Sequence, residues 1–237
     1  MTPRRRMPTH ALLPLLLAAP AHAASLQAFP VLIEMNDKAP TAVVSLRNTG
    51  DRPIEVQTRV MRWSQSDGRE TLVEAEDVIA SPPMTSLMPG ANYAVRLVRL
   101  ARTPLAGETS YRVLVDQLPE AAARRGSAVA LVTRHSIPVF IGRSRQAMPR
   151  LTWRLGQRNG KLALRVSNSG GRRLRLSNVA LHLSDGRKVG FGNGLLGYVL
   201  AGSTMEWVAN VPANRADGIV HAITDLGPLS ARVHAGR

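Results

Sequence analysis

Residues 42–60 read AVVSLRNTGDRPIEVQTRV, two segments of alternating residues joined by a short polar turn. Within each segment apolar and polar side chains alternate with a period of two, which is typical of a β-strand with one buried face. Asn48 and Gly50 can adopt the positive-φ conformations that tight connections need. The stretch therefore predicts a strand, an Asn-x-Gly turn and a second strand.

The same pattern returns in the second half of the chain. Val166-Ser167-Asn168-Ser169-Gly170 precedes an alternating segment at 172–179, as the first Asn-x-Gly turn precedes the segment at 52–60. Two copies of one β unit predict two similar β sandwiches.

Strand signals also dominate the rest of the sequence. Tyr93–Leu97 and Tyr111–Val115 alternate in the same way. Only Glu74–Ala80 and Glu120–Arg124 could form short helical turns, so the sequence predicts an all-β fold.

A connector separates the two β units. Residues 142–146, Gly-Arg-Ser-Arg-Gln, have the small and polar character of a linker. We therefore expect one domain at 24–141 and a second at 149–237. A single large β sandwich is the alternative.

The first 23 residues carry signals of export. Arg4, Arg5 and Arg6 form a basic segment, Ala11–Ala19 is apolar, and Ala21-His22-Ala23 supplies the small-x-small pattern that a signal peptidase reads. The apolar stretch has about half the length that a membrane-spanning helix requires. We expect a signal peptide at 1–23, export to the periplasm and no membrane insertion.

The formal net charge of +15 is unevenly distributed. Residues 25–141 carry 13 Lys/Arg against 12 Asp/Glu, whereas residues 142–237 carry 15 against 4. A basic half indicates nucleic acid, an anionic membrane or an acidic partner. Aromatic residues are only 4% of the chain, and nucleic-acid binders combine positive charge with stacking aromatics or a reading helix. The composition therefore argues against nucleic acid and favours a solvated basic surface.

The sequence contains no catalytic or cofactor-binding constellation. It has no cysteine, which excludes disulfides and thiolate metal sites, and its histidines have no metal-ligand spacing. Gly190–Gly194 is glycine-rich like a nucleotide loop but lacks the Lys-Ser/Thr that completes one. We predict a protein that is not an enzyme and that uses no metal and no cofactor.

Residues 127–140 read SAVALVTRHSIPVF, a long and largely apolar strand. Val129, Leu131 and Thr133 lie on one face of it. Long apolar strands are normally central or protected, because an open one pairs with another chain. By periodicity alone this is an internal sandwich strand. At a sheet edge it could instead add a strand to an incomplete partner.

Ten short motifs, weakly specific one by one, gain specificity from their order and spacing. They are Asn48-Thr49-Gly50, Arg59–Trp63, Ser81-Pro82-Pro83, Pro89-Gly90, Arg96-Leu97, Ser110-Tyr111-Arg112, Asp116–Pro119, Arg134–Phe140, Asn168–Gly170 and Gly197–Leu200. In this order the chain resembles the periplasmic chaperones of the chaperone–usher pilus pathway, the PapD-like family. It resembles most closely the archaic branch, typified by Csu-type pili. The resemblance covers essentially the whole mature chain.

The resemblance implies two immunoglobulin-like β-sandwich domains in an L or boomerang arrangement. It implies pilus subunits as partners, here spore-coat-U-like pilins, and delivery of these subunits to an outer-membrane usher. A subunit of this family lacks its last strand, and the chaperone donates its own strand to fill the groove. The donated side chains would be Val129, Leu131 and Thr133.

The resemblance also implies a basic anchor for the subunit's C-terminal carboxylate. The positions where typical members carry this anchor fall near Leu32 and Pro138, so the sequence departs from the pattern there. The archaic branch points to Arg112 and Arg134 instead. Arginine suits the task because its planar fork binds a carboxylate bidentately.

A secreted β-sandwich adhesion protein whose basic second half binds an anionic polysaccharide is the alternative function. High salt should strip a polyanion from such a protein and leave a strand-complemented complex largely intact.

Overall fold

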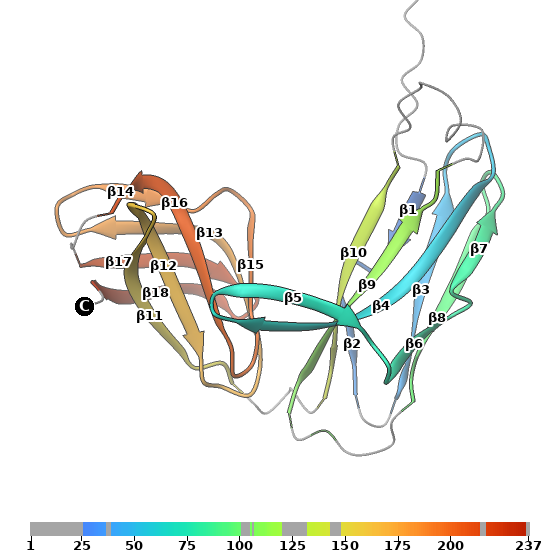
Figure 1. Cartoon of the computed structure of the whole chain (residues 1–237), viewed down its shortest axis with the longest axis horizontal. Helices are drawn as coiled ribbons and strands as arrows, with labels where there is room; N and C mark the ends of the chain where they lie inside the picture. The colour runs from blue at the N-terminus through green and yellow to red at the C-terminus, as the bar shows by residue number, and fades with distance from the viewer. Residues whose placement is uncertain are drawn as a thin grey trace, which may run out of the picture.

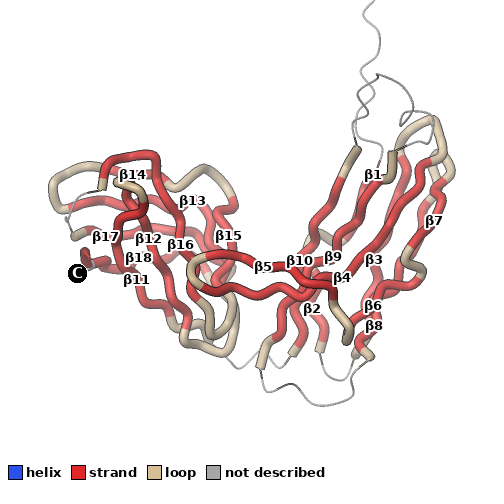
Figure 2. Tube along the Cα trace, viewed as in Figure 1, coloured by secondary structure: helices blue, strands red, loops and turns tan. Residues whose placement is uncertain are grey.

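A computed structural model describes residues 26–36, 39–100, 105, 107–119, 132–142, 148–213 and 217–235. Within these residues the regular secondary structure consists of β-strands alone (Figure 2), which confirms the predicted all-β fold. The strands form two packed units that lie at an angle to each other and give the molecule a boomerang shape (Figure 1).

The first unit consists of two facing sheets. One has the strand order β1-β3-β8-β6, and the other has the order β2-β10-β9-β4-β5 with β7 beside β4. The strands are β1 (Leu26–Phe29), β2 (Ile33–Met35), β3 (Thr41–Asn48), β4 (Ile54–Ser66), β5 (Arg69–Glu74), β6 (Val78–Ser81), β7 (Met84–Leu87), β8 (Asn92–Arg99), β9 (Thr109–Gln117) and β10 (Arg134–Ile141).

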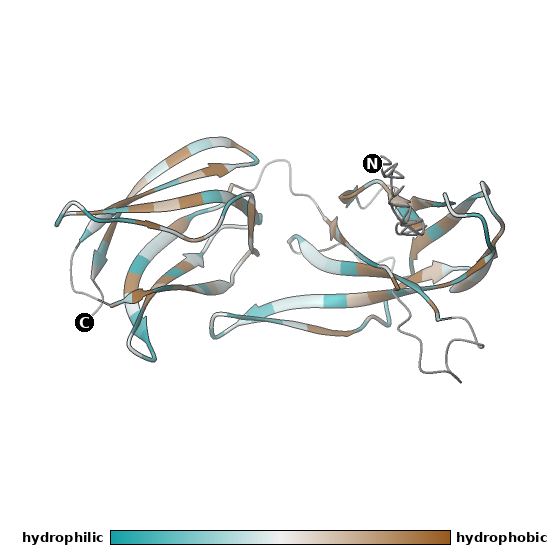
Figure 3. Cartoon of the chain, turned by 90° about the horizontal axis from the view of Figure 1, so that it is seen from above, coloured by the Kyte–Doolittle hydropathy of each residue, from teal (hydrophilic) through white to brown (hydrophobic). Residues whose placement is uncertain are grey.

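The core of the first unit lies between these sheets. Successive side chains of a strand point to opposite faces, so every second residue enters the core. Val44 and Leu46 from β3 meet Val113 and Val115 from β9 there, and all four are fully buried. Figure 3 shows the resulting alternation of apolar and polar positions along the strands.

The predicted turn at Asn48 carries the chain from one sheet to the other, because β3 and β4 belong to different sheets. The Asn48 side chain donates from Nδ2 to the carbonyl oxygens of Arg52 (2.7 Å) and Leu87 (2.9 Å). Its Oδ1 accepts a hydrogen bond from the Gly50 backbone N–H at 2.9 Å. This fully buried amide therefore fixes the crossing between the two sheets.

The second unit is an eight-stranded sheet with the order β14-β13-β17-β18-β11-β12-β16 and β15 beside β13. It encloses its own apolar core, which contains Trp153, Leu164, Leu181 and Val220. The strands are β11 (Leu151–Arg158), β12 (Lys161–Asn168), β13 (Leu174–Leu183), β14 (Lys188–Gly190), β15 (Leu195–Val199), β16 (Thr204–Pro212), β17 (Gly218–Thr224) and β18 (Gly227–Ala235).

The internal repeat predicted from the sequence is confirmed at the level of hydrogen bonds. Asn168 donates from Nδ2 to the carbonyl oxygens of Arg172 (2.7 Å) and Val199 (3.2 Å), and its Oδ1 accepts from the Gly170 N–H at 2.9 Å. Each of these hydrogen bonds has its counterpart around Asn48, so the two units stabilise this turn in the same way.

The helical turn considered for Glu74–Ala80 is wrong. Glu74 ends β5, and Val78 begins β6, which pairs with β8. The second such segment, Glu120–Arg124, lies outside the described residues.

The β4–β5 hairpin extends from the first unit to the second (Figure 1). At its tip, Gly68 forms a parallel bridge with Met205, and the Glu206 N–H donates to the Gly68 carbonyl oxygen at 3.3 Å. The hairpin thus adds its tip to the edge of β16.

Candidate functional site

The six-stranded sheet of the first unit has a second face, opposite the core. On β9, Tyr111, Val113 and Val115 belong to the core cluster. Because side chains alternate along a strand, Arg112 and Asp116 lie on the opposite face. Arg112 is paired with Pro138 on β10 and with Met61 on β4, in the middle of the sheet.

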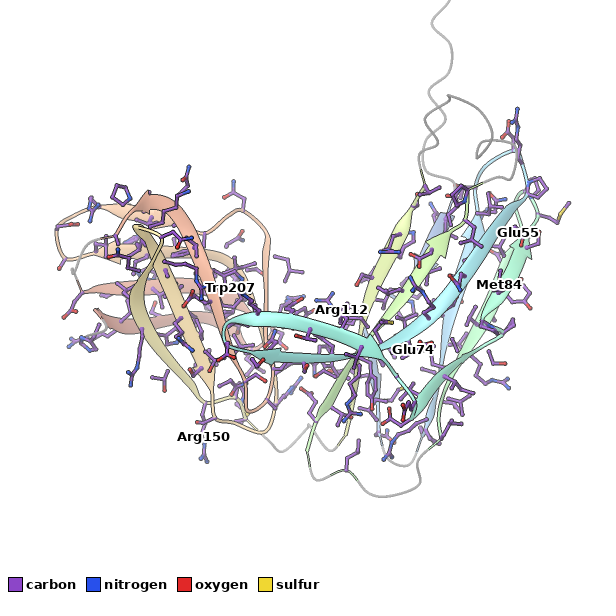
Figure 4. The ribbon with its side chains drawn as sticks, viewed as in Figure 1. Glu55, Glu74, Met84, Arg112, Arg150 and Trp207 are labelled. Atoms are coloured by element: carbon purple, nitrogen blue, oxygen red, sulfur yellow. The ribbon has the colours of Figure 1, made fainter. Side chains whose placement is uncertain are left out.

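Arg112 lies at the base of the angle between the two units (Figure 4). Its guanidinium carbon is 3.9 Å from the centroid of the Trp63 ring, a cation–π contact. A nitrogen of the same group is 3.7 Å from a Glu70 carboxylate oxygen. The Arg112 side chain is 19% exposed, so its donors remain reachable from solvent. The two residues paired with Arg112 in its row, Pro138 and Met61, carry no charge.

An aromatic cluster joins the two units. Trp63 and Phe140 from the first unit pack on Tyr198 from the second, with ring centroids 5.6 to 5.9 Å apart. Leu200 completes the buried cluster, and Leu32 packs against it. We call this cluster, with the charged residues that contact it, the domain junction.

Polar contacts reinforce the domain junction. Gln65 donates from Nε2 to the Tyr198 carbonyl oxygen and accepts from the Leu200 N–H, both at 2.9 Å. Because Gln65 is on β4, these bonds tie the first unit's long hairpin to β15 and the residue after it.

Arg173 is an almost fully buried charge at the domain junction, with only 2% of its side chain exposed. It bonds to Glu108 through both its backbone N–H (2.9 Å) and its guanidinium (2.5 Å), and it is also bonded to Glu34. The guanidinium lies 3.7 Å from the centroid of the Phe140 ring. Sequence reasoning missed this residue. Its only signal was its place before Leu174, at a polar position of an alternating strand.

Arg134 lies at the other end of the same sheet face. It is paired in register with Asp116, four residues along β10 from Pro138, which is about 13 Å in a strand. The structure therefore does not bring Arg112 and Arg134 together. Arg134 forms an ion pair with Asp116, and Arg59 bonds to the same carboxylate at 2.7 Å.

This pairing governs the protonation of Asp116. Burial acts to raise its pKa, but hydrogen bonds from Arg134 and Arg59, and the charges of both, outweigh burial. The pKa of Asp116 therefore lies below its ordinary value. The Arg134 side chain itself is 62% exposed, so most of it faces solvent.

The edge of β10 is partly open. β10 pairs with β9 along its whole length, from Arg134 to Ile141, but β2 covers its other edge only at Val139–Ile141. Among the described residues no strand covers the edge at Arg134–Pro138. Thr133 extends the pairing with β9 by one residue, since its carbonyl oxygen accepts from the Gln117 N–H at 2.9 Å.

The predicted donor strand lies mostly outside the described residues. Of Val129, Leu131 and Thr133, only Thr133 is described, and it is half-buried. The regular strand begins one residue later, at Arg134.

An apolar pocket of about 470 Å³ lies beside this open edge. Its lining includes Ala28 and Phe29 from β1, Val31 from the loop after β1, and His135 from β10. Phe29 and Val31 are 70% and 76% exposed. A His135 ring nitrogen lies 2.9 Å from the Leu26 carbonyl oxygen and links β10 to β1 across the open side of the sandwich.

The described residues contain no group of three or more His, Cys, Asp or Glu side chains that could hold a metal ion. A search of the same residues finds no helix with the length and apolarity needed to cross a bilayer.

Comparisons with known proteins agree on the fold. The chain is similar to a chain in the crystal structure of the CsuC–CsuE chaperone–tip adhesion subunit pre-assembly complex from archaic Csu pili of Acinetobacter baumannii, at 24% identity and a TM-score of 0.71. The match covers 90% of this chain and 100% of that one. The YadV chaperone is 20% identical, with a TM-score of 0.61 over 88% of this chain and 99% of that one.

A third similar structure is that of the Salmonella enterica SafA pilin in complex with the SafB chaperone, at 18% identity and a TM-score of 0.59. That match covers 90% of this chain and 98% of that chain. At such identities the likeness shows the fold alone, and it confirms the two immunoglobulin-like β domains expected from the sequence. A search of curated proteins finds no significant match.

The sequence itself decides the family. The profile described as "Pili and flagellar-assembly chaperone, PapD N-terminal domain" matches residues 25–143, which is half of the chain. The chain therefore belongs to the PapD family of pilus-assembly chaperones.

Proposed function

We propose that this chaperone holds pilus subunits by donor-strand complementation in the periplasm and passes them to an outer-membrane usher. The subunits are spore-coat-U-like pilins of the archaic branch, and the chain acts without catalytic turnover and without a cofactor. The proposed signal peptide, residues 1–23, lies outside the described residues. The proposed domains are residues 24–141 and 149–237, and the end of β10 at Ile141 and the start of β11 at Leu151 support these bounds.

The open edge of β10 is the observation that carries this proposal. An uncovered strand edge presents backbone N–H and C=O groups that pair with another chain. Residues 127–133 precede β10 in the sequence and would supply the apolar donor side chains Val129 and Leu131 and the smaller Thr133. Main-chain hydrogen bonds would give affinity, and the alternate side chains would fill the subunit's groove.

The apolar pocket beside β1 supports the proposal that subunits bind at the open edge of β10. Phe29 and Val31 are large side chains that remain mostly exposed in the free chain. Burying apolar surface contributes about 25 cal/mol per Å² as an upper estimate. A subunit paired with the β10 edge would cover these residues and remove them from water.

Arg112 is the proposed anchor for the subunit's C-terminal carboxylate. It is partly desolvated on Trp63, and its contact with Glu70, at 3.7 Å, is longer than a hydrogen bond. A carboxylate could therefore take the bidentate position. Arg134 remains the second predicted anchor residue, and a subunit would have to compete with Asp116 for it.

Affinity purification from the periplasm of the native host tests the proposal. The tagged mature protein would be compared with Arg112→Ala, Arg134→Ala and Arg150→Ala, and co-purifying proteins identified by mass. Arg150 is exposed and lies on the second unit, away from the domain junction (Figure 4), so its variant is a matched control for the loss of one charge.

We expect wild type and Arg150→Ala to hold a small pilin-like protein near one to one, and Arg112→Ala to lose it. Retention by Arg112→Ala would move the anchor elsewhere. A complex with anionic glycan that dissociates in high salt, with no pilin-like partner, would favour the adhesion protein instead.

A further inference from the structure

Three arginines surround Tyr198 at the domain junction, and they differ in their partners. Arg173 is bonded to two carboxylates, and Arg112 has one distant contact with Glu70. The Arg175 side chain has no ion pair and no hydrogen bond within the described residues, and its Nε is buried without a partner. The two terminal nitrogens of this guanidinium are not in the buried state of Nε, and they can donate to an anion.

The strand register places Arg175 on the face that meets the first unit. Leu174 and Leu176 point into the core of the second unit, so Arg175 points away from that core. It is directly opposite Tyr198 on β15, and such cross-strand neighbours have Cβ atoms about 4.5–5.5 Å apart. Tyr198 packs edge-on against Trp63, with ring centroids 5.6 Å apart.

Arg112 contacts the same Trp63 ring from the first unit. The order across the domain junction is therefore Arg112, Trp63, Tyr198 and Arg175, with a cation at each end of an aromatic pair. The Tyr198 hydroxyl makes no hydrogen bond within the described part of the chain, so it is a further free donor.

Charge around Tyr198 supports this arrangement. Burial raises the pKa of Tyr198, while the positive charges of Arg175, Arg173 and Arg112 act in the opposite direction. Asp225 is the opposing carboxylate nearby, and it already accepts the Arg175 backbone N–H at 3.0 Å. Glu70, Glu34 and Glu108 contact the side chains of Arg112 and Arg173, whereas Asp225 bonds only to the backbone of Arg175. Among the described residues the Arg175 guanidinium is therefore the one of the three without a carboxylate partner, and an incoming carboxylate could take that place.

We propose that Arg175 is a second carboxylate anchor, contributed by the C-terminal domain, which with Arg112 binds the terminal carboxylate of the bound subunit across the domain junction. This inference rests on the proposed function. Trp63 and Tyr198 are themselves buried, at 3% and 4% exposed, so the subunit's terminal carboxylate contacts the two guanidinium groups and not the faces of these rings. One carboxylate then contacts both domains, so the angle between the domains becomes part of subunit recognition.

A double-mutant cycle on protein and subunit tests the inference. The subunit is the one that co-purifies with wild type, used in its native form and in a form extended by Gly-Ser-Gly, which moves the carboxylate away. Wild type, Arg175→Gln and Arg154→Gln would be compared for Kd with both forms. Arg154 is an exposed arginine of β11 without an ion pair among the described residues, and its variant loses the same charge.

We expect Arg175→Gln to raise Kd for the native subunit about tenfold, the loss typical of one hydrogen bond to a charged group. Arg154→Gln should stay within about twofold of wild type, and Arg175→Gln should change the affinity for the extended subunit equally little. An unchanged Kd for Arg175→Gln, or the same loss with both subunit forms, would overturn the assignment.

Two further results remain decisive. If Arg175→Gln lowers the melting temperature, Arg175→Lys is tested as well, because it keeps the positive charge. Arg175→Lys must then bind the native subunit more tightly than Arg175→Gln does, and it must show no such gain for the extended subunit. If wild type binds no subunit at all, the proposed function itself fails. Binding by wild type with equal binding by both Arg175 variants removes only the second anchor.

Discussion

Replacing Arg173 by methionine should lower the free energy that holds the two domains together at the domain junction. Arg173 is almost fully buried, and Glu108, which it contacts through two hydrogen bonds, has a side chain that is only 1% exposed. Methionine keeps the apolar first part of the side chain but removes the guanidinium that lies on Phe140, and with it the charge. The substitution therefore leaves a buried carboxylate without its counter-charge.

The expected cost follows from this burial. Removing one partner of a buried ion pair typically costs about 3–5 kcal/mol, because the remaining charge is uncompensated. Glu34, the other partner, has a side chain that is 50% exposed, so water can solvate it and it adds little. If the domains part, water reaches Glu108 as well, which limits the cost to the free energy of the domain junction. We expect about 3 kcal/mol.

Calorimetric unfolding of a double-mutant cycle measures this coupling. Arg173→Met, Glu108→Gln and the double variant would be compared with wild type at neutral pH. Glu108→Gln in the Arg173→Met background removes the orphaned charge, so the double variant should be more stable than the sum of the single losses predicts. We expect a coupling of about 2 kcal/mol. A coupling below about 0.5 kcal/mol, with both single variants destabilised, would refute an ion pair as the source of the cost.

Three other perturbations have defined outcomes. Asn48→Ala and Asn168→Ala each leave a buried carbonyl without its donor. Each should lower the free energy of unfolding of its own domain by about 1–3 kcal/mol, as measured in that domain's calorimetric transition. An equal loss of stability in both transitions would contradict two separate local roles. Because the folded-state pKa of Asp116 is lowered, this group stabilises the fold above its ordinary pKa of 3.8, and the contribution is lost as pH falls through the folded value. The urea midpoint of Asp116→Asn should therefore lie below that of wild type at pH 7, and the gap should shrink below pH 3.8, whereas a constant gap would contradict the linkage. Gly68 has a φ of +78°, and a Cβ there would lie 2.6 Å from the Glu206 Cβ, so Gly68→Ala should lift the hairpin tip from β16 and speed hydrogen exchange of the Glu206 amide; unchanged exchange would show that the tip does not depend on this contact.

Much of the fold could be predicted because its signals are local. Alternation over Ile54–Val60 marks β4, and each Asn-x-Gly turn is specified within about five residues. The helical turn at Glu74–Ala80 was wrong because β6 is a four-residue strand, Val78–Ser81, too short for alternation to identify. Its pairing with β8 supplies the missing information, and that contact is remote in the sequence.

The site was harder to predict, because a site depends on register. Arg112 and Arg134 do share one face of the sheet, yet four residues of β10 separate their rows. Alternation in a sequence shows which face of the sheet a strand residue occupies. It does not show the register, that is, which residue of the neighbouring strand lies opposite. The partner of Arg134, Asp116, could be found only once β9 and β10 were aligned.

The basic second half of the chain shows the same limit from the side of charge. Its excess of Lys and Arg was interpreted as a solvated surface, because only 4% of the chain is aromatic and the basic residues are scattered through strand-like segments. The structure gives Arg173 the carboxylates of Glu34 and Glu108, both from the first half, and places Arg172 3.7 Å from Glu34. Part of the charge asymmetry is therefore complementarity between two domains of one chain. Arg175 has no such partner among the described residues, which makes it the arginine of this group that a subunit can still use.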